Sequence, residues 1–149
     1  MGAGGHAGVK SPFALVQEIR HWFDGPVALS GSISTADAVL AAQATGADFA
    51  YIGSAFIATE EARAADAYKQ AIVHGNYLAP SICVAGLDPE NLPVSVPSAM
   101  NFGGGSAKAW KEIWGCGQGI GAIYKVQSTA EFVAQLKREY AQARARLAL

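Results

Sequence analysis

Residues 27–54 read VALSGSISTADAVLAAQATGADFAYIGS, and this stretch decides the fold. Its two apolar runs, Val27-Ala28-Leu29 and Phe49-Ala50-Tyr51-Ile52, are short and do not alternate with polar residues, which is typical of parallel strands covered on both faces. Between them, residues 35–45 are predicted to form a helix that stops at Gly46, a residue type favoured just after a helix C-terminus. The order strand, turn, helix, strand, turn predicts a parallel βαβ unit and an α/β fold.

A further helix is predicted before this unit. Ser11 can cap it and Pro12 fits its first helical position, while Asp24-Gly25-Pro26 ends it. The apolar residues of this helix fall on one face, as in a helix that packs on a core. They are Leu15, Val16, Ile19, Trp22 and Phe23.

The rest of the chain is predicted to be mainly helix and loop. Residues 59–73 form an alanine-rich helix that Gly75 closes, residues 77–86 are interpreted as helical, and residues 87–106 are a loop rich in Pro, Gly and Asn. The last helix begins with the capping box Ser128-Thr129-Ala130-Glu131. Its apolar face carries Phe132, Val133, Leu136, Tyr140 and Leu147.

Composition bounds the function classes. The chain has 149 residues, 51% of them hydrophobic, which suits one domain with a buried core. The formal net charge is −1, so nothing electrostatic favours binding to nucleic acid or to an anionic membrane surface. Three late arginines, Arg138, Arg144 and Arg146, suit the C-terminal part of a solvated helix.

Cysteine, histidine and hydropathy patterns indicate a soluble, cytoplasmic protein without a metal site. Cys83 and Cys116 belong to no CxxC pattern, and we expect both to be reduced thiols. The three histidines, His6, His21 and His74, show no metal-ligand spacing. No charged-then-apolar leader opens the sequence, and no apolar run reaches the length of a membrane span.

The two turns after the predicted strands are candidates for an anion site. Ser30-Gly31-Ser32 and Gly53-Ser54 each follow a strand, and adjacent parallel strands would place both turns at the same edge of the sheet. Backbone N–H groups, Ser hydroxyls and a helix N-terminus can together hold a phosphate. The alternative is that Gly and Ser serve only as tight-turn residues.

A glycine-rich loop at residues 2–8, Gly-Ala-Gly-Gly-His-Ala-Gly, holds a candidate general base. His6 has the side chain best suited to proton transfer near neutral pH, and its glycine neighbours would let it project into a cleft. A structural role for His6 is the alternative. We interpret His74 as part of a helix C-terminal cap and His21 as a packing or surface residue.

A second glycine-rich segment, Gly115-Cys116-Gly117-Gln118-Gly119-Ile120-Gly121, is not a dinucleotide motif. It does not match GxGxxG, and no clear strand precedes it. Its alternate glycines suit close backbone approach to a flat ligand, or a sharply bent loop that packs on its neighbour. Gln118 is a candidate ligand contact, because its amide both donates and accepts hydrogen bonds.

Together these motifs resemble the nitronate monooxygenase family, formerly called 2-nitropropane dioxygenases, which are FMN-dependent (β/α)₈ barrels. The resemblance begins with Ala3-Gly4-Gly5-His6-Ala7-Gly8 and Ser11-Pro12-Phe13-Ala14-Leu15-Val16, and continues with Leu29-Ser30-Gly31. It extends through the run from Tyr51 to Glu61 and returns at Gly117-Gln118-Gly119-Ile120-Gly121. It covers nearly the whole chain.

The resemblance implies roles for individual residues. His6 stands where the family has its catalytic histidine, which acts as base toward the carbon beside the nitro group. Gly4 stands where the family has a glycine that approaches the flavin. We expect Gly5 beside it and the candidate contact Gln118 to bind the cofactor as well. Two turns would bind the FMN phosphate, namely Ser30, Gly31 and Ser32 in the first and Tyr51, Ile52, Gly53 and Ser54 in the second.

The resemblance also implies the reaction. An alkyl nitronate, or a nitroalkane that first loses a proton, would react with oxygen to give a carbonyl compound and nitrite. Two alternatives stay open, a catalytically silent truncated remnant and a fragment of the related NADH-dependent flavin enoyl reductases.

Relative to the family, the chain resembles a partial TIM (β/α)₈ barrel plus a mainly helical substrate-side domain. We expect residues 1–59 to be the C-terminal part of the barrel with two parallel strands, 60–124 a substrate-side segment, and 125–149 a helix that returns to the barrel. About six strands would come from elsewhere, which implies a homo-oligomer or a complementing N-terminal barrel half. The connection after Val73 is shorter than is usual in the family.

Overall fold

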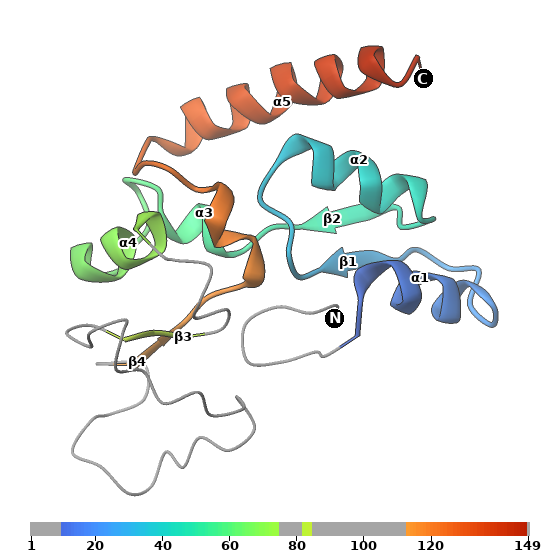
Figure 1. Ribbon diagram of the computed structural model, residues 1–149, viewed down its shortest axis with the longest axis horizontal. Coiled ribbons are helices and arrows are strands. Elements are labelled where there is room, and N and C mark those ends of the chain that lie inside the picture. The colour runs from blue at the N-terminus through green and yellow to red at the C-terminus, as the bar shows by residue number, and fades with distance from the viewer. Residues whose placement is uncertain (1–9, 75–81, 85–112, 149) are drawn as a thin grey trace, which may run out of the picture.

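The computed structural model describes residues 10–74, 82–84 and 113–148 (Figure 1). Its helices are α1 (Pro12–Arg20), α2 (Ala36–Ala44), α3 (Ser54–Ile57), α4 (Asp66–Val73), the 3₁₀ helix η3 (Gln118–Ala122) and α5 (Thr129–Arg146). Its strands are β1 (Ala28–Ser30), β2 (Phe49–Tyr51), β3 (Ile82–Val84) and β4 (Ile113–Gly115).

The predicted parallel βαβ unit is confirmed. Strands β1 and β2 pair in parallel, with Leu29 opposite Ala50. Helix α2 connects them and begins at Thr35, whose side-chain oxygen accepts a hydrogen bond from the Ala38 backbone N–H at 3.3 Å. The helix ends before Gly46, whose φ of +104° is a conformation that glycine adopts without strain.

Helices α1 and α2 cover one face of the sheet formed by β1 and β2. The buried residues between them and β1 are Val16, Val27, Leu29, Ile33, Ala42 and Ala47. Two expectations for α1 are wrong. Ser11 makes no side-chain capping bond, and Trp22 is 74% exposed because the helix ends at Arg20 and the chain turns away. Trp22 and Phe23 instead contact each other, with ring centroids 5.8 Å apart.

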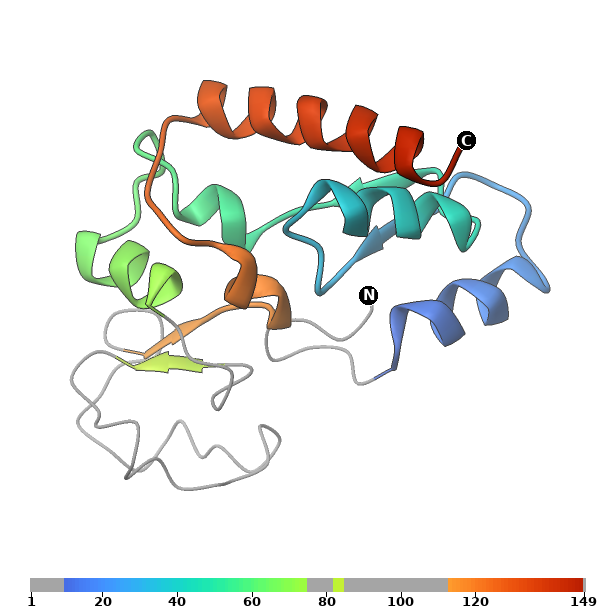
Figure 2. The same cartoon turned by 45° about the horizontal axis from the view of Figure 1, so that its top comes forward.

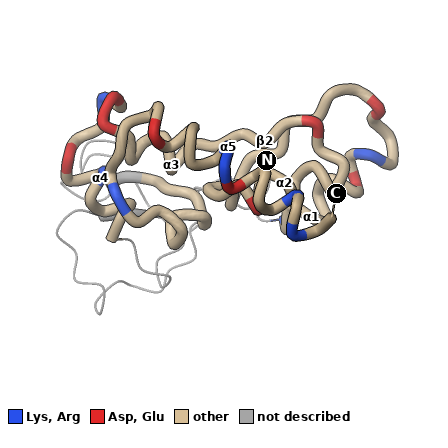
Figure 3. The backbone as a smooth tube through the Cα atoms, turned by 90° about the horizontal axis from the view of Figure 1, so that it is seen from above, with Lys and Arg blue, Asp and Glu red and all other residues tan. Residues whose placement is uncertain are grey.

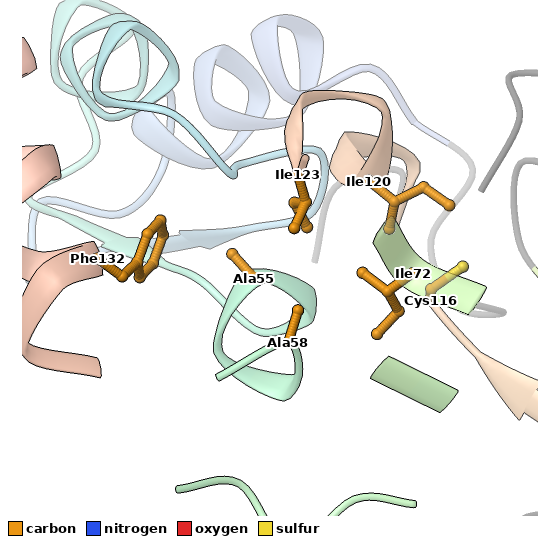
Figure 4. Packing of buried hydrophobic residues seen from close by; sticks show 7 residues of the cluster. All are labelled: Ala55, Ala58, Ile72, Cys116, Ile120, Ile123 and Phe132. Atoms are coloured by element: carbon orange, nitrogen blue, oxygen red, sulfur yellow. The ribbon is translucent and has the colours of Figure 1, made fainter. Parts of the chain in front are cut away.

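A second core lies between α3, α4, η3 and α5 (Figure 4). Its buried members are Ala55, Ala58, Ile72, Cys116, Ile120, Ile123 and Phe132. The Phe132 ring meets the edge of Phe56 at a centroid distance of 5.1 Å, an arrangement that aromatic pairs prefer. Ile52, directly after β2, packs against both cores and so connects them.

The predicted helix over residues 59–73 is wrong in its first half, because α4 begins only at Asp66. Thr59 instead forms a parallel β-bridge with Gln127, whose carbonyl oxygen accepts from the Glu60 N–H at 3.0 Å. The Glu61 carboxylate accepts from the Thr129 N–H at 2.9 Å, and this bond is the main reason that the pKa of Glu61 lies below its usual range. These contacts with a distant segment outweigh the local helix propensity of the alanines.

The capping box of the last helix is confirmed, with Ser128 and Glu131 each accepting from the other's backbone N–H. Helix α5 then runs along α2 (Figures 1 and 2), where Tyr140 donates to Gln43 and Ala143 is buried. The predicted apolar face is buried at Phe132, half-buried at Val133, Leu136 and Tyr140, and 56% exposed at Leu147.

Strands β3 and β4 form a separate antiparallel pair, with Cys83 opposite Trp114. The helical interpretation of residues 77–86 is therefore wrong at 82–84, where the partner strand β4 supplies the backbone hydrogen bonds. Strand β4 also ends at the first glycine of the 115–121 segment, so a strand does precede that segment. Residues 75–81 and 85–112, with Gly75 and the predicted loop, lie outside the described residues.

Acidic and basic residues are interspersed along the described chain (Figure 3). Over the same residues, no helix combines the length and apolar character that a membrane crossing requires.

One polar cluster connects α1 to the starts of both parallel strands. The Asp48 carboxylate accepts from the Val27 N–H at 2.8 Å and from the Arg20 guanidinium at 2.6 Å. Arg20 also donates to the carbonyls of Gly46 at 2.8 Å and Gly25 at 2.7 Å. The bond from Val27, followed by that from Arg20, lowers the pKa of Asp48 below its usual range.

We predict that Asp48→Asn lowers the urea midpoint of unfolding at pH 7, and that this loss shrinks as the pH falls below about 4. A carboxyl whose folded-state pKa lies below its ordinary value of about 3.9 contributes its full stabilisation above that value. The contribution disappears as the pH falls through the lower, folded-state pKa, so wild type and variant should converge there. Asp24→Asn, which changes an exposed carboxylate in the loop after α1, is the matched control. A loss that stays the same from pH 7 down to the lowest pH at which the chain is folded would contradict the assignment.

Candidate functional site

The two turns predicted to hold an anion lie side by side. Ser30, the last residue of β1, is directly opposite Tyr51, the last residue of β2. Because the strands are parallel, the residues that follow them leave the sheet at the same edge. The predicted adjacency of Gly31-Ser32 and Gly53-Ser54 is thus present in the structure.

The first turn has an unusual backbone. Gly31 has φ +109° and Ser32 has φ +59°. The left-handed region is free for glycine but costs a serine of order 1 kcal/mol or more, so surrounding contacts must hold Ser32 there. The turn leads directly into α2, whose N-terminus carries the positive end of the helix dipole.

The second turn is open to solvent. Gly53 is exposed, and a Cβ added to it would meet no atom within 4 Å. Its carbonyl oxygen accepts from the N–H groups of Phe56 and Ile57, which starts the short helix α3. Tyr51 is 65% exposed and Ile52 is half-buried beside the turn. A ligand can therefore approach the backbone at Gly53 closely.

The glycine-rich segment after β4 contacts both turns. The Gly117 N–H donates to the Ser54 hydroxyl at 2.8 Å. Gly119 lies against the first turn, because a Cβ there would be 2.4 Å from Ser34 Oγ and 3.1 Å from the Ser32 carbonyl carbon. Gln118 lies between them and is exposed. Three motifs that are far apart in the sequence thus meet in one place.

The remaining predicted site residues are placed only in part. His6, Gly4 and Gly5 lie outside the described residues. His74 ends α4 as its C-cap, with Nδ1 2.9 Å from the Gln70 carbonyl oxygen, which confirms the capping interpretation. His21 is the exposed C-cap of α1. Among the residues that the structure describes, no group of three His, Cys, Asp or Glu side chains could hold a metal ion.

Sequence reasoning missed Ser34 and the bridging role of Gly117 and Gly119. Ser34 is nearly fully buried beside the first turn and has no sequence signal of its own. The alternate glycines of the 115–121 segment did indicate close packing, but not the partner. The dinucleotide interpretation stays unsupported, since β4 pairs antiparallel with β3 and leads into a 3₁₀ helix.

An apolar cavity of about 180 Å³ lies beside the first turn, between α1 and α2. Its lining comes from the start of α1, the end of β1 and one face of α2. Among the lining residues are Phe13, Leu29, Gly31, Ile33 and Ala41. The lining is almost wholly apolar, so this cavity does not itself supply an anion site.

Comparison with known proteins decides the family. Residues 1–82 match the model of a family described as nitronate monooxygenase. The chain belongs to the nitronate monooxygenase family. A curated nitronate monooxygenase from Paraburkholderia phytofirmans is 30% identical over 174 residues, which include 94% of this chain and 47% of the relative. This family member therefore spans about half the length of that relative.

Solved structures show a shared fold. FabK from Thermotoga maritima superposes with a TM-score of 0.72 at 22% identity, covering 97% of this chain and 53% of that one. A nitroalkane oxidase from Streptomyces ansochromogenes gives a TM-score of 0.69 at 23% identity, covering 97% and 51%. The alignment with the Paraburkholderia relative spans 174 residues and is longer than this 149-residue chain. That relative therefore has segments within the aligned region that this chain lacks. The shorter connection after Val73 stays a prediction.

We predict that Gly31→Ala destabilises the chain, whereas Gly53→Ala does not. Alanine at φ +109° is strained and should cost about 1–3 kcal/mol of unfolding free energy. At Gly53 the added methyl group meets open space and φ is −110°, so stability should change by less than about 0.5 kcal/mol. Urea unfolding of both variants measures this, and equal losses would contradict the described turn geometry.

Proposed function

We propose that this chain forms the FMN-phosphate-binding part of a flavin-dependent nitronate monooxygenase. One observation supports this most strongly, the meeting of the two strand-end turns with the glycine-rich segment after β4. Family membership supports the proposed reaction, an oxidation of alkyl nitronates by oxygen to a carbonyl compound and nitrite. The fold alone would not, because one scaffold can host several reactions.

The described residues fit a phosphate group. Gly53 leaves the backbone open where a Cβ would otherwise stand. Gly31 has φ +109°, which glycine adopts without strain, and turns the chain from β1 toward α2. The Ser54 hydroxyl accepts from Gly117, and its own O–H can donate to an oxyanion. The residues proposed to hold the cofactor are Gly4, Gly5, Ser30, Gly31, Ser32, Tyr51, Ile52, Gly53, Ser54 and Gln118.

His6 is proposed as the general base. Its imidazole would accept the proton from the carbon beside the nitro group, which converts a neutral nitroalkane into the nitronate anion. Bound FMN would accept electrons from that anion. The protein contributes position and a favourable electrostatic environment for the anionic substrate.

The sheet is proposed to be part of a (β/α)₈ barrel that further strands complete. Ala28, Phe49 and Tyr51 are exposed on the side of the sheet opposite Leu29, and Phe49 is 62% exposed. An exposed apolar face of this kind marks a surface that another element covers. The missing cover would come from an N-terminal barrel half or from a second copy of this chain. The division into residues 1–59, 60–124 and 125–149 belongs to this proposal.

Two other functions compete with the proposal. The chain superposes on FabK about as well as on nitroalkane oxidase, so an NADH-dependent flavin enoyl reductase fragment is the second candidate. A catalytically silent remnant is the third, supported by the exposed sheet face. Flavin binding separates the third candidate from the first two, and flavin reduction by NADH separates those two.

The first test compares FMN with riboflavin, which differs from FMN only in lacking the phosphate. We expect the purified chain to bind FMN about tenfold or more tightly than riboflavin, in an oligomer or with a complementing barrel half. Visible absorption measures the binding, and light scattering on the same sample measures the size. A protein sample that is colourless after incubation with FMN and removal of the free flavin by gel filtration would favour the silent remnant. A flavin-loaded monomer would refute only the need for a partner.

The role of His6 is tested by His6→Asn on the flavin-loaded protein. We expect the rate with neutral nitroalkanes to fall by about a hundredfold or more, because no side chain then accepts the carbon-bound proton. The rate with preformed nitronates should change far less, since that proton has already left. Oxygen consumption with both substrates measures the split, and an equal loss with both would refute the base assignment.

A further inference from the structure

The glycine-rich segment after β4 leaves no room for a side chain where it meets the first turn. A Cβ on Gly119 would lie 2.4 Å from Ser34 Oγ, 3.1 Å from the Ser32 carbonyl carbon and 3.3 Å from the Ser32 oxygen. Ser34 is only 7% exposed, so its hydroxyl has little space to move aside. The Ser32 atoms belong to the backbone, so they can retreat only if the turn itself changes shape.

The first turn keeps its shape only if contacts from other segments hold it. Ser32 has φ +59°, a conformation that serine adopts only when surrounding contacts impose it. Gly119 packs directly on the Ser32 peptide, so it is in place to supply part of that constraint. The same segment reaches the second turn two residues earlier, through the bond from Gly117 to Ser54.

The segment is itself firmly held. Ile120 and Ile123 are buried in the core around α3 and α4, beside Ile72 and Cys116 (Figure 4). At its other end, Tyr68 of α4 donates a hydrogen bond to the Gly115 carbonyl. A strained turn thus rests on a segment anchored in the hydrophobic core.

We infer that Gly119 is a positioning residue, which holds the turn at Gly31-Ser32 in the shape that receives the flavin phosphate. This inference rests on the proposed function. Gly117 and Gly119 would act on the two phosphate turns without needing to touch the cofactor themselves. Any side chain at position 119 would push the first turn away from the second.

The test is Gly119→Ala in the full chain, with FMN and riboflavin as the two probes. We expect FMN affinity to fall about tenfold or more and riboflavin affinity to stay within about twofold, because only the phosphate contacts are disturbed. Gly25→Ala is the matched control. It adds the same methyl group beside the exposed ring of Phe23, before β1 and so at the opposite end of that strand from the first turn, and should leave both affinities unchanged.

A second variant keeps the test decisive if Gly119→Ala folds poorly. Adding Ser34→Ala removes the atom nearest to the new methyl group. Gly119→Ala should therefore lower the FMN affinity less in the Ser34→Ala background than in the wild-type chain. An equal loss in both backgrounds would overturn the inference, as would wild-type FMN affinity in Gly119→Ala. If the wild-type chain itself binds FMN no better than riboflavin, the phosphate assignment fails and the inference fails with it.

Hydrogen exchange gives a readout that does not depend on flavin. In Gly119→Ala without ligand, the amides of residues 31–35 should exchange faster, while those in the middle of α5 should not. Unchanged exchange at residues 31–35 would overturn the inference even where the flavin proposal holds.

Discussion

The site depends on the parallel pairing of β1 with β2 at Ser30 and Tyr51. Parallel strands end at the same edge of a sheet, so this register alone brings two short turns together that are about twenty residues apart in the sequence. An antiparallel pairing would separate them to opposite ends. Helix α2 enforces the parallel direction, because it must cross from the end of one strand to the beginning of the next.

The βαβ unit could be predicted because each of its signals is local. The Thr35 cap, the positive φ at Gly46 and the capping box at Ser128 are all set by contacts within four residues. The local pattern also predicted that the two turns are adjacent. A strand–helix–strand order predicts parallel strands, and parallel strands end at the same edge of the sheet. The family resemblance through the turns and the 117–121 segment agreed with this architecture.

Errors arose where distant segments decide the local structure. The alanine-rich stretch after Thr59 has high helix propensity, yet its first residues pair with the chain at Gln127 instead. Trp22 continues the apolar periodicity of α1, but Arg20 bonds to the carbonyls of Gly25 and Gly46 just where that helix ends. The contact of Gly119 with Ser34 is likewise long-range, and no pattern in either segment identifies the other.

These contacts divide the proposed activity into two parts with different requirements. The shape of the phosphate turns is set within this chain, by α2, by the Ser54–Gly117 bond and by the packing of Gly119. The sheet face with Phe49 and Tyr51 is exposed, and in the proposed barrel further strands would cover it. Phosphate recognition should therefore survive changes to the rest of the barrel better than catalysis does, because its supports lie in the two cores that Ile52 connects.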